Sequence, residues 1–263
     1  MVDIEYLLGF YPPHIAQNVN MHKHILKEYV ELLSLDYLTR TPTAERLIFI
    51  GGTNLRLIQS INRFSEDLDF DCKELPESEF LEMTDGLICH LRQCGLQAEP
   101  RDKVNNKLTA YRRSIYFPEL LFELGLSGHH EERFLLKVEA QDQGINYTKE
   151  TAMVNRCGFL FPVQVPSNSI LLSMKLSALL SRAKGRDFYD TLFLWQKTEP
   201  DLAFLKLRCG IGSRGELYTA LMERIAATDL KVKQRDFEHL LFTPSDSARI
   251  LFFPEFVKDK LAK

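Results

Sequence analysis

The sequence predicts an α+β fold with α/β-like alternation, in which a small mixed sheet is flanked by helices and followed by a helical C-terminal domain. Three observations favour this class. The apolar run Leu47–Ile50 ends at Gly51-Gly52, which is typical of a buried strand followed by a glycine turn. Residues 67–71 alternate acidic and apolar side chains with the period of a strand. After residue 166, apolar side chains recur at helical spacing.

The composition is that of an ordinary globular protein. Hydrophobic residues make up 45% and charged residues 26% of the 263 positions, which is enough to bury a sizeable core in one or two domains. No stretch approaches the roughly 20 apolar residues that span a bilayer, and the N-terminus lacks the basic segment of a secretory signal. We therefore expect a cytoplasmic protein with no membrane partner.

Cysteines and net charge narrow the function only slightly. The five cysteines are scattered without a C-x-x-C pair, which argues against a disulfide framework or a zinc knuckle. The formal net charge of -3 provides no global attraction to nucleic acid, although a local basic patch could still do so. Charge therefore leaves the substrate open.

Helices and short strands alternate through the first part of the chain. Apolar spacing predicts helices over roughly the first forty residues, from the glycine turn to Arg63, and over 76–95. Besides the two strands described above, strands are predicted at 114–117, 120–126 and 133–140. Because turn residues separate these three segments, we expect a meander of adjacent strands.

A change of pattern marks the predicted domain boundary. The segment Phe159–Pro166 is extended and contains two prolines, so we interpret it as the connection between two domains. The first, residues 1–165, carries the strands. The second, residues 166–263, is predicted to be helical and to contribute to the active site.

The C-terminal domain begins with clear helix signals. Ser167-Asn168-Ser169 is a good N-cap cluster for a helix over 170–183, and Gly185 is the expected C-terminal stop. A second helix is predicted over 187–195, and more helices from Asp201 onward.

Three carboxylates share one face of the predicted strand at 67–71. Alternate side chains of a strand point to the same side, about 6.6 Å apart, so Asp67, Asp69 and Asp71 project together. Three like charges repel one another unless a cation, a basic side chain or solvent compensates. Mg²⁺ is bound by a few carboxylates together with phosphate oxygens, so such a face could hold Mg²⁺. A solvated acidic edge strand is the alternative.

The glycine turn Gly51-Gly52-Thr53 precedes this strand. Between a strand and a helix, its backbone N–H groups can approach a phosphate closely, and the helix dipole favours the negative charge. A Gly-Gly pair alone is merely a turn. Here Arg63, Ser65 and the acidic strand follow. This order could bring phosphate-binding groups and metal ligands together at one site.

Two ordered motifs resemble a known family. The stretch from Gly51 to Phe70, GGTNLRLIQSINRFSEDLDF, resembles the nucleotidyltransferase superfamily motif of a G-[GS] turn followed by D-x-D. More narrowly, this stretch and the later block from Lys175 to Asp190 resemble the AbiEii/AbiGii toxin family. The resemblance implies a nucleotidyltransferase fold in which Asp67 and Asp69 bind metal, with a third carboxylate on a nearby strand.

Glu139 is the expected third carboxylate. Leu136 and Val138 can face the core while Lys137 and Glu139 share the opposite face of the same strand. The alternative is that Glu139 pairs with a lysine. Lys137 could neutralise phosphate charge or could be an ordinary exposed lysine.

The later block supplies further candidates. Lys175 and Arg182 lie two turns apart on nearly one face of a helix and could reach triphosphate oxygens, although a snorkelling surface lysine is the alternative for Lys175. The resemblance places Asp187 and Asp190 in the active site. Their alternative roles are an N-cap for Asp187 and a first-turn acid for Asp190.

The resemblance implies a Mg²⁺-dependent nucleotidyltransferase that moves a nucleotide from an NTP to an acceptor hydroxyl. It also implies a toxin of a toxin–antitoxin system, with RNA such as tRNA as acceptor and a cognate antitoxin. Transfer to a small molecule, phosphoryl transfer and a non-catalytic binding protein on the same fold remain alternatives. The nucleotide-binding candidates are Gly51, Gly52, Thr53, Arg63, Ser65 and Arg182. The catalytic candidates are Asp67, Asp69, Glu139, Lys175, Asp187 and Asp190, of which the first three are also the metal ligands.

Overall fold

The computed structural model describes residues 2–102 and 109–261, and the chain divides into two compact units. The first unit consists of Met1–Ser60, Phe64–Gln143 and Lys149–Val165, and the second of Ile61–Arg63, Gly144–Thr148 and Pro166–Lys263. This division differs from the predicted one because two short internal segments group with the second unit. The sheet lies in the first unit, and the long helical stretch of the C-terminal half lies in the second.

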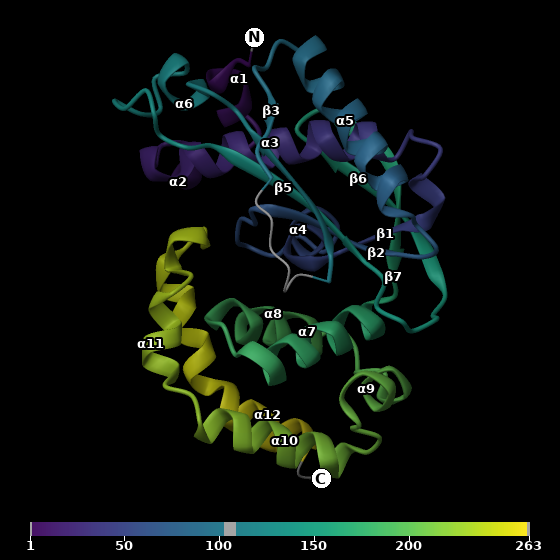
Figure 1. The fold of residues 1–263 in the computed structure, drawn as a ribbon. Helices are drawn as coiled ribbons and strands as arrows, with labels where there is room; N and C mark the ends of the chain where they lie inside the picture. The colour runs from purple at the N-terminus through teal and green to yellow at the C-terminus, as the bar shows by residue number, and fades with distance from the viewer. Residues whose placement is uncertain (1, 103–108, 262–263) are drawn as a thin grey trace. The chain divides into compact units, whose positions relative to one another are not determined.

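A mixed sheet forms the centre of the first unit. Within the described ranges its strands are β1 (Leu47–Ile50), β2 (Asp67–Cys72), β3 (Glu99–Pro100), β4 (Tyr111–Tyr116) and β5 (Leu135–Gln141). Their order is β1-β2-β5-β4-β3, with β2 and β5 parallel and the other neighbours antiparallel (Figure 1). The predicted α+β class with a small mixed sheet is confirmed.

Two long helices cover the apolar side of this sheet. α3 (Val19–Leu38) packs against β2 and β5, and α5 (Glu77–Gln93) packs against β4. Their apolar side chains share one core with Leu68, Ile115 and Val138. α4 (Gly51–Leu57) follows β1 directly and contacts β1 and β2. Shorter helices of this unit are α1 (Ile4–Leu8), α2 (Pro13–Ala16), η1 (Ala44–Arg46) and α6 (Leu120–Glu123).

The segment predicted to connect two domains is a strand. β7 (Phe159–Pro166) pairs with β6 (Lys149–Arg156), which the apolar pattern does not predict. Cys157 and Gly158 make the turn between them, with φ of +49° and +82°. The extended backbone of β7 is therefore explained by sheet pairing and by burial of Phe161 and Val163, rather than by a linker.

Two further predictions are wrong in detail. Residues 120–126 do not form a strand: Glu119 adopts a left-handed φ of +55°, and α6 then buries Leu120 and Leu121. The helix after the glycine turn ends at Leu57 instead of continuing to Arg63, since Ser60 also takes a left-handed φ of +60°.

The second unit is built from helices. They are α7 (Asn168–Arg182), α8 (Gly185–Trp195), α9 (Leu202–Cys209), α10 (Arg214–Ala226), α11 (Leu230–Arg235), η2 (Glu238–Leu240), η3 (Pro244–Phe252) and α12 (Phe253–Leu261). Ser167 caps α7 as predicted, because its side chain accepts a hydrogen bond from the backbone N–H of Ile170. Gly185 does not stop that helix. Ala183, with φ of +46°, ends α7, and Gly185 is the first residue of α8.

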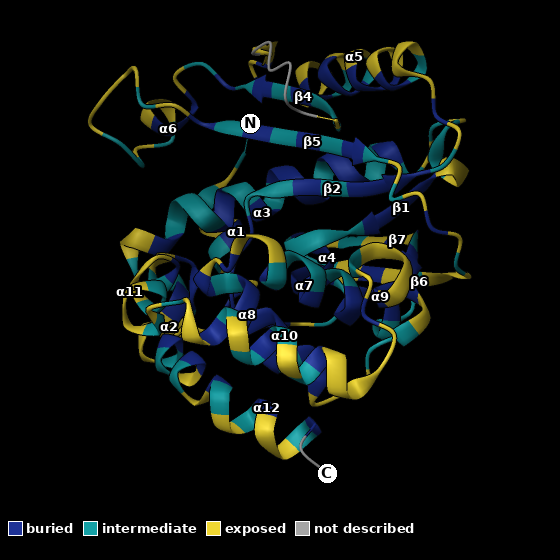
Figure 2. Ribbon diagram, turned by 60° about the horizontal axis from the view of Figure 1, so that its bottom comes forward, coloured by how far each residue is buried: buried dark blue, intermediate teal, exposed yellow. Residues whose placement is uncertain are grey.

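Burial follows the expected periods. Figure 2 shows half-buried and buried residues alternating along β5, which is the pattern of a strand with one face on the core. In the described part of the chain, no helix has both the length and the apolar character that membrane crossing requires.

Candidate active site

The glycine turn is held tightly against the acidic strand. β1 ends at Ile50, and Gly51 opens α4 with φ of +82°, a conformation that L side chains rarely adopt. A Cβ atom at Gly51 would lie 2.2 Å from Oδ2 of Asp69. Thr53 Oγ1 donates a 2.5 Å hydrogen bond to the backbone carbonyl of Asp67. The sequence therefore needs glycine at position 51 both for the turn and for the close approach of backbone to Asp69.

Three neighbouring strands place polar side chains in two rows on one face of the sheet. In the first row Asp67 of β2 lies beside Lys137 of β5, which lies beside Ser114 of β4. In the second row Asp69 lies beside Glu139, which lies beside Arg112. We call these six residues the acidic face. The predicted proximity of Asp67, Asp69 and Glu139 follows from this register, because adjacent strands lie about 4.8 Å apart.

Two ion pairs cross the acidic face. Lys137 Nζ donates to Oδ1 of Asp67 at 3.2 Å, and Arg112 Nε lies 2.9 Å from Oε1 of Glu139. Asp67, Asp69 and Glu139 are all half-buried, so they are reachable from solvent while their neighbours face the core.

Asp71 is buried and is therefore not part of the solvent-accessible acidic face. Its side chain is completely buried, although spacing alone places it with Asp67 and Asp69. Oδ1 of Asp71 accepts a 2.9 Å hydrogen bond from the backbone N–H of Gln143, and Lys73 Nζ lies 3.6 Å away. Asp71 therefore stabilises the end of β2. Ser65, a predicted nucleotide contact, is buried just before β2.

The donor set of the acidic face fits Mg²⁺ when a nucleotide supplies the remaining ligands. Among the described residues, no group of three or more His, Cys, Asp and Glu side chains is arranged to hold a metal by itself. Mg²⁺ does not require such a cage, because it is usually bound by one or two carboxylates plus phosphate oxygens and water. Asp67 and Asp69 provide two carboxylates from alternate positions of one strand, and Glu139 lies next to Asp69.

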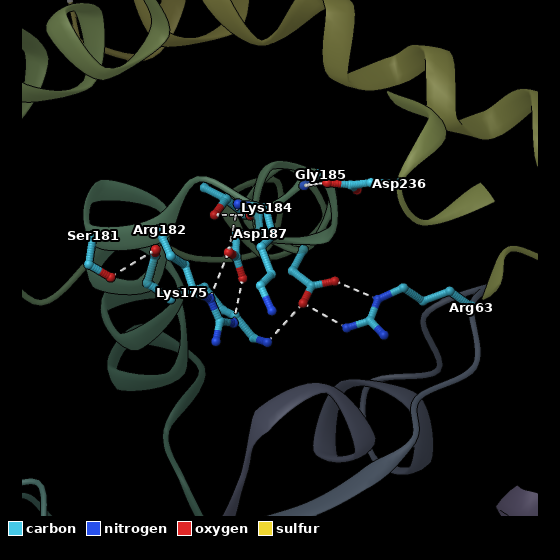
Figure 3. Close-up of polar contacts among 11 residues, drawn as sticks. Arg63, Lys175, Ser181, Arg182, Lys184, Gly185, Asp187 and Asp236 are labelled. Carbon is cyan, nitrogen blue, oxygen red and sulfur yellow. Dashed lines mark hydrogen bonds and ion pairs between the residues drawn. The ribbon is translucent and has the colours of Figure 1, made fainter. Parts of the chain in front are cut away.

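The candidates of the second unit form two separate clusters. In the first, the carboxylate of Asp190 on α8 binds Arg63 in a bidentate pair at 2.6 and 2.7 Å and also binds Lys175 Nζ at 2.8 Å. Arg63 and Lys175, both labelled in Figure 3, come from different segments of the chain. Burial alone would raise the pKa of Asp190, but the charges of Arg63 and Lys175 hold it at about 2.

The second cluster joins the end of α7 to the start of α8. Arg182 donates to both carboxylate oxygens of Asp187 at 2.8 and 2.9 Å, and Asp187 Oδ2 also accepts from the backbone N–H of Lys184 (Figure 3). The alternative that Asp187 is the N-cap is wrong, since Lys184 is the N-cap and Asp187 is the third helical residue. Asp190 lies in the second turn of α8 instead of the first. Both acids hold cations in this structure.

Two groups of charged residues were not predicted. Arg112 precedes the predicted start of its strand, and only the pairing of β4 with β5 brings it to Glu139. Glu28 on α3 accepts hydrogen bonds from Arg56 at 2.5 Å and from Tyr11 at 3.0 Å, and all three side chains are buried. The Glu28–Arg56 pair anchors α4, the helix that carries the glycine turn. The helical period of α3 indicates its buried side but gives no sign that acids lie on it.

Comparisons with known proteins identify a family and a shared fold. A family model described as nucleotidyl transferase AbiEii toxin, type IV toxin–antitoxin system, matches residues 34–241. The structure is similar to MenT4, a nucleotidyltransferase toxin from Mycobacterium tuberculosis H37Rv, with a TM-score of 0.67 and 19% identity over 98% of this chain and 90% of that one. It is also similar to JHP933 from Helicobacter pylori, with a TM-score of 0.51 and 19% identity over 91% of this chain and 93% of that one. No curated protein sequence matches significantly. At these identities the solved structures establish a shared fold.

Proposed function

The chain belongs to the nucleotidyl transferase AbiEii toxin family of type IV toxin–antitoxin systems, and we propose that it transfers a nucleotide from an NTP to an acceptor hydroxyl with Mg²⁺ as cofactor. The observation that carries this proposal is the register of β2 and β5, which sets Asp69 beside Glu139 and two residues along β2 from Asp67. The Asp69 carboxylate lies against a glycine turn whose backbone can approach a phosphate.

Each residue of the acidic face has a proposed role in the reaction. Asp67, Asp69 and Glu139 would hold Mg²⁺, which supplies Lewis-acid stabilisation of the triphosphate charge. Glu139 would also orient the acceptor hydroxyl or accept its proton. The acceptor oxygen forms a bond to the α-phosphorus, the bond from that phosphorus to the β-phosphate oxygen breaks, and pyrophosphate leaves. The backbone at Gly51-Gly52-Thr53 would bind phosphate oxygens, and Ser65 is a further proposed nucleotide contact.

The clusters of the second unit are proposed to provide phosphate-binding cations. Lys175, Arg182 and Arg63 would contact triphosphate oxygens, as guanidinium and ammonium groups commonly do. Asp190 and Asp187 orient these side chains, because each carboxylate accepts from cations at 2.6 to 2.9 Å. Acids in this position act on the reaction through the cations that they hold.

The acceptor and the partner are proposed from the family. An RNA hydroxyl, such as that at the acceptor end of tRNA, is the proposed acceptor, and the product of a cognate antitoxin gene is the proposed regulator. We place the reaction in the cytoplasm, where NTPs and RNA are available.

Asp69 and Asp71 provide a matched test of the site. Purified full-length protein with Mg²⁺, total RNA and α-labelled NTPs is expected to label RNA. Asp69→Asn removes a proposed metal ligand and should lower labelling by about a hundredfold or more. Asp71→Asn changes the same residue type on the same strand at a buried position that contacts Gln143 and Lys73, outside the acidic face, so labelling should persist. Equal activity of Asp69→Asn and wild type would contradict the assignment; circular dichroism checks that both variants are folded.

A further inference from the structure

The strand register places two cations, Lys137 and Arg112, on the acidic face. Asp67, Asp69 and Glu139 face Lys137 and Arg112, so the three carboxylates keep a formal excess of one negative charge. Each cation pairs with one proposed metal ligand. A metal ion beside the same carboxylate would repel the side-chain cation and draw on the same negative charge, so the two cations weaken one another's binding to it.

The pairs Lys137–Asp67 and Arg112–Glu139 are partly exposed, so they are held less rigidly than a fully buried ion pair. The side chain of Lys137 is 40% exposed, so it can leave Asp67 without being stranded in the core. Arg112 Nε lies 2.9 Å from Glu139, yet it is buried and makes no hydrogen bond with any described residue. The guanidinium is close to its carboxylate but not aligned with it, and its donor remains available to another acceptor.

The neighbouring arginine makes the contrast clear. Arg113 points to the opposite side of β4 and is fixed by Asp85 and Asp102, both at 2.7 Å, and by a hydrogen bond to Thr84. Its side chain is 8% exposed. Adjacent arginines on one strand thus differ: Arg113 is held by three acceptors, whereas among the described residues Arg112 has Glu139 alone as an ion-pair partner, without a hydrogen bond from Nε.

Resting on the proposed function, we propose that Arg112 and Lys137 are exchangeable counter-ions. They neutralise Glu139 and Asp67 while these carboxylates hold no metal, and they contact phosphate oxygens of the nucleotide once metal has taken their place. Arginine and lysine both bind phosphate oxygens well, so the incoming triphosphate offers each cation a replacement for the carboxylate that it gives up. The pair would couple binding of metal to binding of nucleotide.

The proposal predicts effects of opposite sign on metal and on phosphate. Mn²⁺ binding to the full-length protein without nucleotide is measured by electron paramagnetic resonance for wild type, Arg112→Gln and Lys137→Gln. Because a competing cation is removed, each variant should bind Mn²⁺ about threefold more tightly, the size expected for a half-exposed ion pair. In saturating Mn²⁺, binding of tripolyphosphate should weaken by a similar factor. Tripolyphosphate carries the phosphate chain common to all NTPs and needs no knowledge of the preferred base.

Lys73→Gln is the control. Lys73 pairs with Asp142 at 2.8 Å and lies beyond the end of β2, so its removal changes net charge equally without touching the two rows. It should leave both affinities unchanged. Mn²⁺ affinity that is unchanged or weaker in both Arg112→Gln and Lys137→Gln would overturn the proposal, as would equal shifts in the control. If the variants bind Mn²⁺ more tightly and tripolyphosphate more weakly but the wild-type protein transfers no nucleotide, this inference holds and the proposed function is wrong. Failure of the one is therefore distinguishable from failure of the other.

Discussion

The carboxylate of Asp190 is completely buried, yet its pKa is about 2. Burial by itself disfavours a charged carboxylate and would raise the pKa. The two cations beside it, Arg63 and Lys175, outweigh that effect. Breaking such a group by removing one member is costly, since the remaining charges stay buried without a partner.

Asp190 should therefore contribute a pH-dependent part of the stability. Its pKa is depressed from 3.8 to about 2, so its contribution is present above pH 4 and is lost as the pH falls towards 2. Asp190→Asn should lower the free energy of unfolding at pH 7 by about 3 to 5 kcal/mol. The difference from wild type should narrow by about 2 kcal/mol between pH 5 and pH 2, as measured by urea denaturation. A difference that is the same at both pH values would refute this electrostatic explanation.

The sequence predicts the positions of some site residues and not of others. The strand period places Asp67 and Asp69 on one face, and the same rule orients Glu139. Arg112 could not be assigned, because its position depends on which strand pairs with β5. Glu31 on α3 was also hidden: it is fully buried, neither of its carboxylate oxygens has a hydrogen-bond partner among the described residues, and burial raises its pKa well above the usual range.

At the scale of elements, the turn between α7 and α8 depends on a close packing contact. A Cβ atom at Gly185 would lie 2.0 Å from the backbone carbonyl oxygen of Lys233 and 2.4 Å from Oδ1 of Asp236. Its backbone N–H donates to the carboxylate of Asp236. Glycine is needed here for space, because residues distant in sequence pack directly against it, and no local pattern could indicate that.

Gly185→Ala should consequently destabilise the second unit. The added methyl group meets backbone, which cannot move aside cheaply, and overpacking of this kind costs about 1 to 3 kcal/mol. Gly215→Ala is the matched control, since a Cβ atom there meets nothing within 4 Å and α10 should gain up to about 1 kcal/mol from alanine. Chemical denaturation of both variants measures the difference. Equal stability of the two would show that the contact at Gly185 is unimportant.

The strands show where periodicity is informative. β5 alternates between core and solvent along its whole length, and β2 does so from Asp67 to Phe70, which is why the strand period predicts both. β6 was missed because Val154 is its one fully buried position, so no apolar alternation marks it. The apolar residues of α6 fit a strand period as well as a helical one, since four residues are too few to distinguish the two periods.

At the scale of the whole molecule, the chain passes between its two units more often than a simple boundary suggests. Residues 61–63 and 144–148 group with the helical unit although both neighbours of each segment belong to the other. Segments of this length leave no compositional signal, so only the change of pattern near residue 165 could be predicted. One of these segments carries Arg63, the partner of Asp190.

Transfer of the α-phosphate with its nucleoside is the central claim for the whole molecule. The direct measurement incubates wild-type protein, Mg²⁺ and total RNA with NTPs labelled at either the α- or the γ-phosphate, with Asp69→Asn in parallel. We expect α-label to be retained in RNA, γ-label to be released in pyrophosphate, and neither to be incorporated by Asp69→Asn. Retention of γ-label in place of α-label would contradict nucleotidyl transfer and identify a phosphotransferase.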